Sequence, residues 1–99
     1  MPITTTMAAD NSTVNIAVSG RFDFNLHKDF REAYKQQDVK AYVIDLAGTE
    51  YMDSSALGML LLLREHAGGD SSDIKIINAN PEISKILTIS NFHRLFNVS

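Results

Sequence analysis

The chain contains no cysteine and no tryptophan, and only two of its 99 residues are proline. Without cysteine, neither a disulfide framework nor a thiolate metal site can form. Basic residues are also few: the chain has nine lysines and arginines and twelve acidic residues, which gives a formal net charge of -3. This balance argues against a basic footprint for nucleic acid or for an anionic membrane surface.

Long hydrophobic runs are also missing. The longest, Met59 to Leu63, is far too short to span a bilayer, and the N-terminal segment MPITTTMAAD lacks the features of a secretory signal. With 44% hydrophobic and 21% charged residues, the composition is that of an ordinary soluble protein. We therefore expect a cytoplasmic protein with no membrane segment, whose single domain covers residues 1–99.

Alternating apolar and polar residues predict a β-hairpin at the start of the chain. In residues 13–20, Val14, Ile16 and Val18 point to one side, which is typical of a half-buried strand that ends at Gly20. A threonine-rich segment at 3–10 is expected to pair with it. The turn between the two strands is predicted at Asp10, Asn11 and Ser12.

Helices and strands alternate through the rest of the chain. Asn25 is predicted to cap a first helix, and the near-continuous apolar run at 41–48 is typical of a central strand covered on both sides. The remaining elements are a helix after residue 53, a strand at 73–79, a helix capped by Asn80 and started by Pro81, and a short final strand within 93–99. This order predicts an α/β fold with a mixed sheet of four to five strands and three helices.

The segment YMDSSALGMLLLLREHAGG, residues 51–69, places an acid and two hydroxyls directly before an apolar helix. A strand that runs into a helix start puts Asp53, Ser54 and Ser55 at the carboxyl edge of the sheet, where α/β folds keep their functional sites. The first N–H groups of a helix lack intrahelical partners, so Asp53 or Ser54 could equally be a simple cap. These three residues alone favour the cap.

The helix that follows has two apolar sides. At 100° per residue, the natural core face consists of Ala56, Leu60, Leu63 and Ala67, and the opposite face of Gly58, Leu61, Leu62 and Glu65. A surface helix should be polar on that second face. The helix is therefore either buried on both sides or presents an apolar patch to a partner. A chain of 99 residues has little material for a second covering layer, which favours the partner surface.

The two serines stand at the N-terminal rim of this patch. A phosphoryl group there would add about -1.5 to -2 charges, which a helix N-terminus tolerates well. A partner docked on Leu61 and Leu62 would have to accommodate that charge beside Asp53. Phosphorylation could therefore switch binding without disturbing the fold.

No catalytic, metal or nucleotide site is expected. None of His27, His66 and His93 has a second ligand at the spacing of a helical metal site, and no loop has the glycine spacing that cradles phosphate. Gly58 is interpreted as a helix-packing glycine. We therefore expect neither a cofactor nor enzyme activity.

Three segments together cover essentially the whole chain: GRFDF, VIDLAGTEYMDSSALGMLLLL and INANPEISKILTISNFHRLF. They resemble the STAS domain family, the anti-sigma factor antagonists of bacteria. GRFDF matches the family's Gly-x-x-Asp through Gly20 and Asp23. VIDLAGTEYMDSSALGMLLLL matches its most specific segment, a buried strand followed by Asp-Ser-Ser-Gly-Leu-Gly and a helix. INANPEISKILTISNFHRLF resembles the later strand, the proline-initiated helix and the closing strand.

The resemblance implies that Ser54 is phosphorylated and that Ser55 is a structural or capping hydroxyl. Asp53 and Asp23 would lie near the site and shape the surface that the kinase reads. The implied partners are a serine kinase of the histidine-kinase-like ATPase type, acting as an anti-sigma factor, and a PP2C-type phosphatase. The unphosphorylated domain would bind the kinase, and phosphorylation would release it.

The sequence departs from the family pattern in two places. Ala56 replaces the first glycine of the Ser-Ser-Gly-Leu-Gly motif, which should stiffen the helix start slightly. The chain also stops at Ser99, where many members carry a further C-terminal helix, so a surface is expected to be open for a homodimer or another partner. The alternative is a constitutive STAS subunit of a transporter or stress-sensing assembly, in which Ser54 is only a cap.

Overall fold

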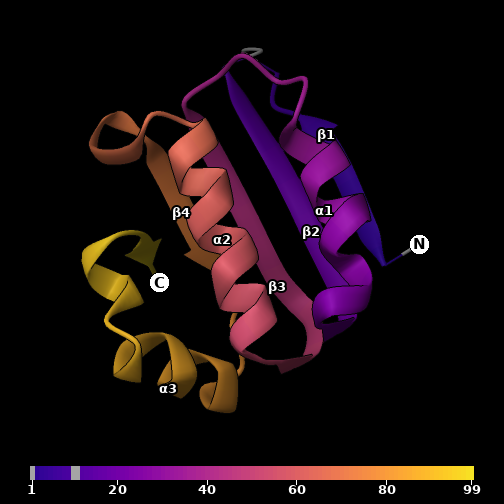
Figure 1. The fold of residues 1–99 in the computed structure, drawn as a ribbon, viewed down its shortest axis with the longest axis vertical. Coiled ribbons are helices and arrows are strands. Elements are labelled where there is room, and N and C mark those ends of the chain that lie inside the picture. Colours follow the sequence, from indigo (N-terminus) through magenta and orange to yellow (C-terminus); the bar gives the residue numbers. More distant parts are fainter. Residues whose placement is uncertain (1, 10–11) are drawn as a thin grey trace.

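A five-stranded sheet forms one layer of the protein in the computed structural model, which describes residues 2–9 and 12–99 (Figure 1). The strands are β1 (Ile3–Met7), β2 (Thr13–Phe22), β3 (Ala41–Met52), β4 (Asp73–Ile77) and β5 (Asn97–Val98). They lie in sequence order, with β1 antiparallel to β2 and every later neighbour parallel. The predicted hairpin and mixed sheet are confirmed. Two of the predicted turn residues, Asp10 and Asn11, lie outside the described residues.

Three α-helices accompany the sheet within the described residues, as predicted: α1 (His27–Tyr34), α2 (Ser54–His66) and α3 (Pro81–Ile89). Short 3-10 turns occur at Phe24–Leu26, Gly69–Ser71 and Phe92–Arg94. Figure 1 shows α1 and α2 side by side over the sheet, with α3 beyond the lower ends of the parallel strands. None of the described helices has both the length and the apolar character needed to cross a membrane.

The hydrophobic core lies between the sheet and the helices. Every second residue of the parallel strands points into it, and these residues are Val14, Ile16, Val18, Tyr42, Ile44, Leu46, Ile74 and Ile76. The helices cover them with Phe30, Ala33, Tyr34, Ala56, Met59, Leu60, Leu63, Ile83 and Leu87. Hydrophobic burial therefore fixes which face of each helix turns inward.

The prediction that the strand at 41–48 is covered on both sides is wrong. β3 is central in the sheet, yet Val43 and Asp45 on its other face are only partly buried. They line a shallow depression together with Thr4, Thr6, Asn15, Ala17 and Ile77. The helices pack on the opposite face, so a small chain has covered one side of its sheet and left the other open.

The prediction that Asn25 caps the first helix is also wrong. β2 continues past Gly20, whose φ of +80° accompanies a register shift, and ends at Phe22. Asp23 follows at once, and its carboxylate accepts a hydrogen bond from the Asn25 N–H at 3.0 Å. This bond opens the 3-10 turn that leads into α1. At α3 the prediction is confirmed, because the Asn80 side chain accepts from the N–H of Ile83 at 2.9 Å.

One buried polar atom in the core has no hydrogen-bond partner among the described residues, the hydroxyl oxygen of Tyr42. The side chain is 1% exposed. Burial raises the pKa of this hydroxyl above its ordinary value, and Tyr34 and Asp38 raise it further. The native state therefore holds this tyrosine neutral, and stability is lost as the pH rises above about 10, where the unfolded chain ionises.

We predict that Tyr42→Phe raises the free energy of unfolding by about 1 kcal/mol at pH 7, because it removes an unpaired polar atom from the core. It should also weaken the loss of stability above pH 10. Urea unfolding at pH 7 and at pH 10.5 measures both effects. Tyr51→Phe is the matched control, because Tyr51 is 39% exposed, and its stability should stay unchanged. A Tyr42→Phe protein less stable than the wild type would show that the hydroxyl is satisfied in solution.

Candidate functional site

Two aspartates lie side by side at the carboxyl ends of β2 and β3. Phe22 and Met52 are paired in register, and Asp23 and Asp53 directly follow them. Neighbouring strands are about 4.8 Å apart, so the two aspartates sit close together on one edge of the sheet. In Figure 1 this is the lower edge, where α2 begins.

Asp53 is the N-cap of α2. Its backbone is extended, and its Oδ1 atom accepts hydrogen bonds from the N–H groups of Ser55 at 3.0 Å and Ala56 at 3.3 Å. A carboxylate is a strong cap because it adds a negative charge at the positive end of the helix dipole. Of the two residues considered as a simple cap, Asp53 is confirmed and Ser54 is wrong, and the capping role implied for Ser55 is wrong as well.

The hydroxyl of Ser54 is left free by this arrangement. Ser54 is the first residue of α2 and is exposed, and its Oγ atom has no hydrogen-bond partner among the described residues. Ser55 is half-buried. Of the two hydroxyls, Ser54 is the one that an enzyme can reach from solvent.

The outer face of α2 consists of Gly58, Leu61, Leu62 and Glu65, all of which are exposed. Leu61 is 40% and Leu62 52% exposed, whereas Leu60 and Leu63 on the inner face are fully buried. Of the two possibilities raised by the sequence, a helix buried on both sides is therefore wrong. Gly58, Leu61 and Leu62 form an apolar surface one to two turns along the helix from Ser54, and Glu65 borders it one turn further on.

Gly58 does not pack closely against another part of the described structure. A Cβ atom added there would meet nothing within 4 Å, so its interpretation as a helix-packing glycine is wrong. Glycine inside a helix costs about 1 kcal/mol relative to alanine. Here the missing side chain leaves open space beside Leu61 and Leu62, so the backbone of another protein can approach the helix closely.

Sequence patterns alone missed three exposed side chains at the same edge. Arg21 lies over the ring of Tyr51, with its Cζ atom 4.0 Å from the ring centroid, and its Nε atom is 3.4 Å from Oδ2 of Asp23. Phe24 is 69% exposed and stacks on His27 with ring centroids 5.4 Å apart. The one signal in the sequence that could have indicated this group of side chains is Phe24, a phenylalanine directly after Asp23 of the Gly-x-x-Asp motif.

A groove adjoins the apolar surface through Leu62. It lies between α1 and α2, has a volume of about 370 Å³ and is lined by His27, Arg31, Tyr34, Leu62 and His66. His66 is held by a hydrogen-bonding contact of 2.9 Å between its Nε2 atom and the carbonyl oxygen of Gln37. Arg31 places a positive charge in the lining of this groove, beside the apolar surface.

The described part of the chain contains no cluster of side chains that could bind a metal ion. No group of three or more histidine, aspartate or glutamate side chains in residues 2–9 and 12–99 could hold a metal ion together. The chemistry that the site offers is a reachable hydroxyl, a carboxylate already engaged as a cap, and an apolar surface.

Comparison with known proteins gives a family match over most of the chain. The model of the family described as Mlab, STAS domain matches residues 5–97. A STAS-domain containing protein of Pseudomonas aeruginosa (strain UCBPP-PA14) is 52% identical over 101 residues, and the alignment covers 100% of both chains.

Solved structures share the fold at low identity. An anti-sigma factor antagonist from Mycobacterium paratuberculosis has a TM-score of 0.76 at 21% identity, with 97% of this chain and 84% of that one covered. The phosphorylated form of SpoIIAA, a cell fate determinant of Bacillus, has a TM-score of 0.71 at 19% identity, with 98% and 90% covered. These similarities establish the α/β architecture.

We predict that Asp53→Ala lowers the free energy of unfolding by about 1 kcal/mol, because two N–H groups of α2 lose their acceptor. Ser54→Ala, its neighbour, should change stability by less than about 0.5 kcal/mol, because the hydroxyl bonds nothing. Thermal and urea unfolding of both variants measures the difference. An equal loss in the two variants would mean that Ser54 shares the cap in solution.

Proposed function

Because this chain belongs to the STAS domain family, we propose that it is a protein-binding module whose hold on its partner is controlled by phosphorylation of Ser54. One observation carries the proposal. Asp53 accepts both of the bonds that a capping serine would take, so the Ser54 hydroxyl stays exposed and unbonded. It does so at the rim of a surface that contains Leu61 and Leu62.

The modification follows from ordinary phosphoryl chemistry. The Ser54 oxygen forms a bond to the γ-phosphorus of ATP, the bond from that phosphorus to ADP breaks, and the hydroxyl proton leaves. The product carries about -1.5 to -2 charges at the N-terminus of α2. The helix dipole favours a negative charge there, so the fold persists.

Release of the partner follows from the same charge. An apolar surface of another protein that covers Leu61 and Leu62 extends over the start of α2 and excludes water there. A phosphoryl group placed in that contact next to the carboxylate of Asp53 would have to be desolvated, which is costly without a paired cation. The unphosphorylated form therefore binds, and the phosphorylated form does not.

The surface has features that suit a protein partner better than a small ligand. Gly58 leaves open space above the helix, and Leu61 and Leu62 offer apolar area beside it. Phe24 adds an exposed ring at the same edge of the sheet. Aromatic and apolar side chains of this kind are typical anchors of an interface.

The partner that we propose is a serine kinase of the histidine-kinase-like ATPase type that also acts as an anti-sigma factor, in the cytoplasm. A PP2C-type phosphatase would restore the free hydroxyl. The similarity of this fold to that of SpoIIAA, which has been solved in a phosphorylated form, supports the proposed phosphorylation. In this pathway the chain is a ligand and a substrate and performs no catalysis itself.

Incubation with the cognate kinase and ATP tests the proposal, with phosphate located by mass spectrometry. We expect one phosphate on Ser54, none on Ser54→Ala, and normal modification of the matched control Ser55→Ala. Ser54→Asp should bind the kinase about tenfold more weakly than the unphosphorylated wild type does, because it places one unpaired charge in the interface. Phosphate on Ser55 alone, or full-strength binding by Ser54→Asp, would overturn the proposal.

The apolar outer face of α2 also suits a second function, that of a constitutive STAS subunit in a transporter or stress-sensing assembly. In that case Ser54→Ala and Ser54→Asp both bind the partner like the wild type. Leu62→Glu abolishes binding under either function, because Leu62 is 52% exposed on the shared surface. The pair of serine variants therefore separates the two functions, and the leucine variant tests the surface that both require.

A further inference from the structure

The outer edge of β1 carries free backbone groups. β1 is the outermost strand on its side of the sheet. At its two ends the Pro2 carbonyl accepts from β2, and the Ala8 N–H donates to β2, both at 2.8 Å. Bonded residues alternate along an antiparallel pair, so the even-numbered residues face β2. The N–H and C=O groups of Ile3, Thr5 and Met7 therefore point away from the sheet.

This edge lacks the features that usually keep other chains away. Protective edges carry a charged residue, a proline or a bulge. Within Ile3–Met7 there is neither a charge nor a proline, and the register with β2 runs without a shift. Threonine fills the three central positions and favours extended structure. The edge is thus open to pairing with one more strand.

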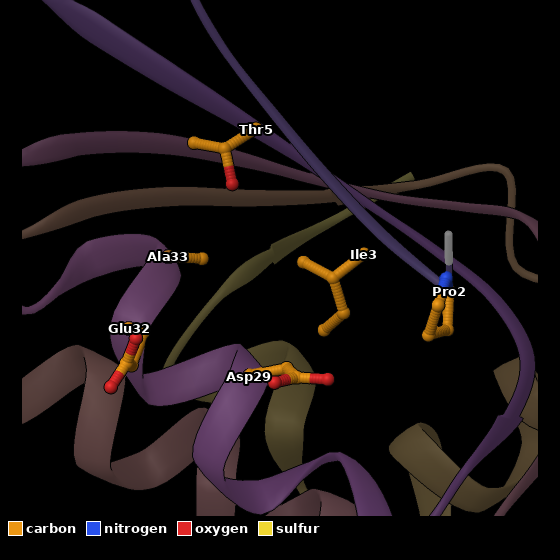
Figure 2. A pocket seen from close by; sticks show the side chains of 6 residues that line it. All are labelled: Pro2, Ile3, Thr5, Asp29, Glu32 and Ala33. Carbon is orange, nitrogen blue, oxygen red and sulfur yellow. The ribbon is translucent and has the colours of Figure 1, made fainter.

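An acidic groove of about 220 Å³ runs beside the edge, on the side of the sheet that the helices cover (Figure 2). Figure 2 shows Ile3 and Thr5 of β1 on one side of it and Asp29 and Glu32 of α1 on the other. Neither carboxylate forms an ion pair with a described residue. The groove therefore places two carboxylates, which have no ion-pair partner among the described residues, next to three outward-facing pairs of backbone groups.

The basic residues of α1 do not reach this groove. Lys28, Arg31 and Lys35 line hollows on other sides of the helix, and none of them lines the groove beside β1. Glu32 lines those hollows as well, so it lies between the groove beside β1 and the basic residues of α1. A strand placed along β1 would meet Asp29 and Glu32 as the charged residues that line the groove.

We propose that the β1 edge and its groove form a strand-addition site for an extended segment of another protein that carries basic side chains at alternate positions. Residues of such a segment that pair with Ile3, Thr5 and Met7 project to the same face as those residues, toward the groove. Lysine or arginine there comes within reach of Asp29 and Glu32. Backbone bonds supply the affinity in this mode, and the alternate side chains supply the specificity.

The charges disfavour a second copy of the chain at this edge. Antiparallel pairing of β1 with β1 of another copy keeps both α1 helices on the same face of the joined sheet. The two grooves, each lined by Asp29 and Glu32, then face each other across the joint, and their carboxylates repel. A basic segment turns the same two carboxylates into an attraction. This site is separate from Ser54 and does not depend on the proposed phosphorylation.

The probe for the test is the peptide acetyl-Thr-Lys-Val-Lys-Val-Lys-Thr-amide, added to the isotope-labelled full chain and followed by NMR. We expect amide hydrogen exchange at Ile3, Thr5 and Met7 to slow severalfold, with no slowing at Ser54. The same peptide with glutamate in place of lysine should bind more weakly, by a factor on the order of five for two exposed ion pairs.

Two variants test the backbone and the charges separately. Thr5→Pro removes the central outward N–H, which β2 does not use, so the fold should survive while peptide binding is lost. The double variant Asp29→Asn with Glu32→Gln should bind the two peptides equally well. Glu82→Gln, an exposed acid at the start of α3, is the matched control and should bind like the wild type.

Three outcomes would overturn the proposal. The first is equal binding of the lysine and glutamate peptides by the wild type. The second is protection of amides elsewhere than on β1. The third is a concentration-dependent dimer of the chain alone that Thr5→Pro abolishes, because that result would assign the edge to a second copy. Sedimentation of both proteins without peptide detects it.

Discussion

The cap on α2 is the interaction on which the rest of the account depends. One carboxylate oxygen of Asp53 accepts from the N–H groups of Ser55 and Ala56. This fixes where the strand ends and the helix starts, and it turns the buried face of α2 onto the sheet. Ser54 is therefore not needed as a cap. A reachable hydroxyl at a helix start exists here because the residue before it satisfies the backbone.

The second constraint is the size of the chain. With 99 residues, the helices cover one face of the sheet and leave the other face, the β1 edge and the outer side of α2 exposed. Small domains have too little material for further layers. The surfaces proposed for partners are therefore those that the fold cannot cover. The apolar side of α2 and the acidic groove beside β1 lie in different places and suit different partners, one with an apolar surface and one with basic side chains.

Periodicity made most of the fold predictable from the sequence. Alternation located the hairpin, and the spacing of leucines separated Leu60 and Leu63 in the core from Leu61 and Leu62 at the surface. Caps were less predictable, because aspartate, asparagine and serine all compete for free N–H groups and only the backbone geometry decides. The cap of the first helix was therefore predicted at Asn25, whereas Asp23 accepts the hydrogen bond. The bulged register that brings Arg21 over Tyr51 leaves no periodic signal, so that contact was missed.

The most direct test of the central claim is amide hydrogen exchange of the chain before and after stoichiometric phosphorylation of Ser54. If Asp53 holds the cap by itself, the amides of Ser55 and Ala56 keep their protection, and the exchange of the core strands is unchanged. The phosphate then acts only as an added surface charge. Loss of protection at these two amides, or a spread of faster exchange along α2, would contradict the account, because it would show that the hydroxyl belongs to the cap.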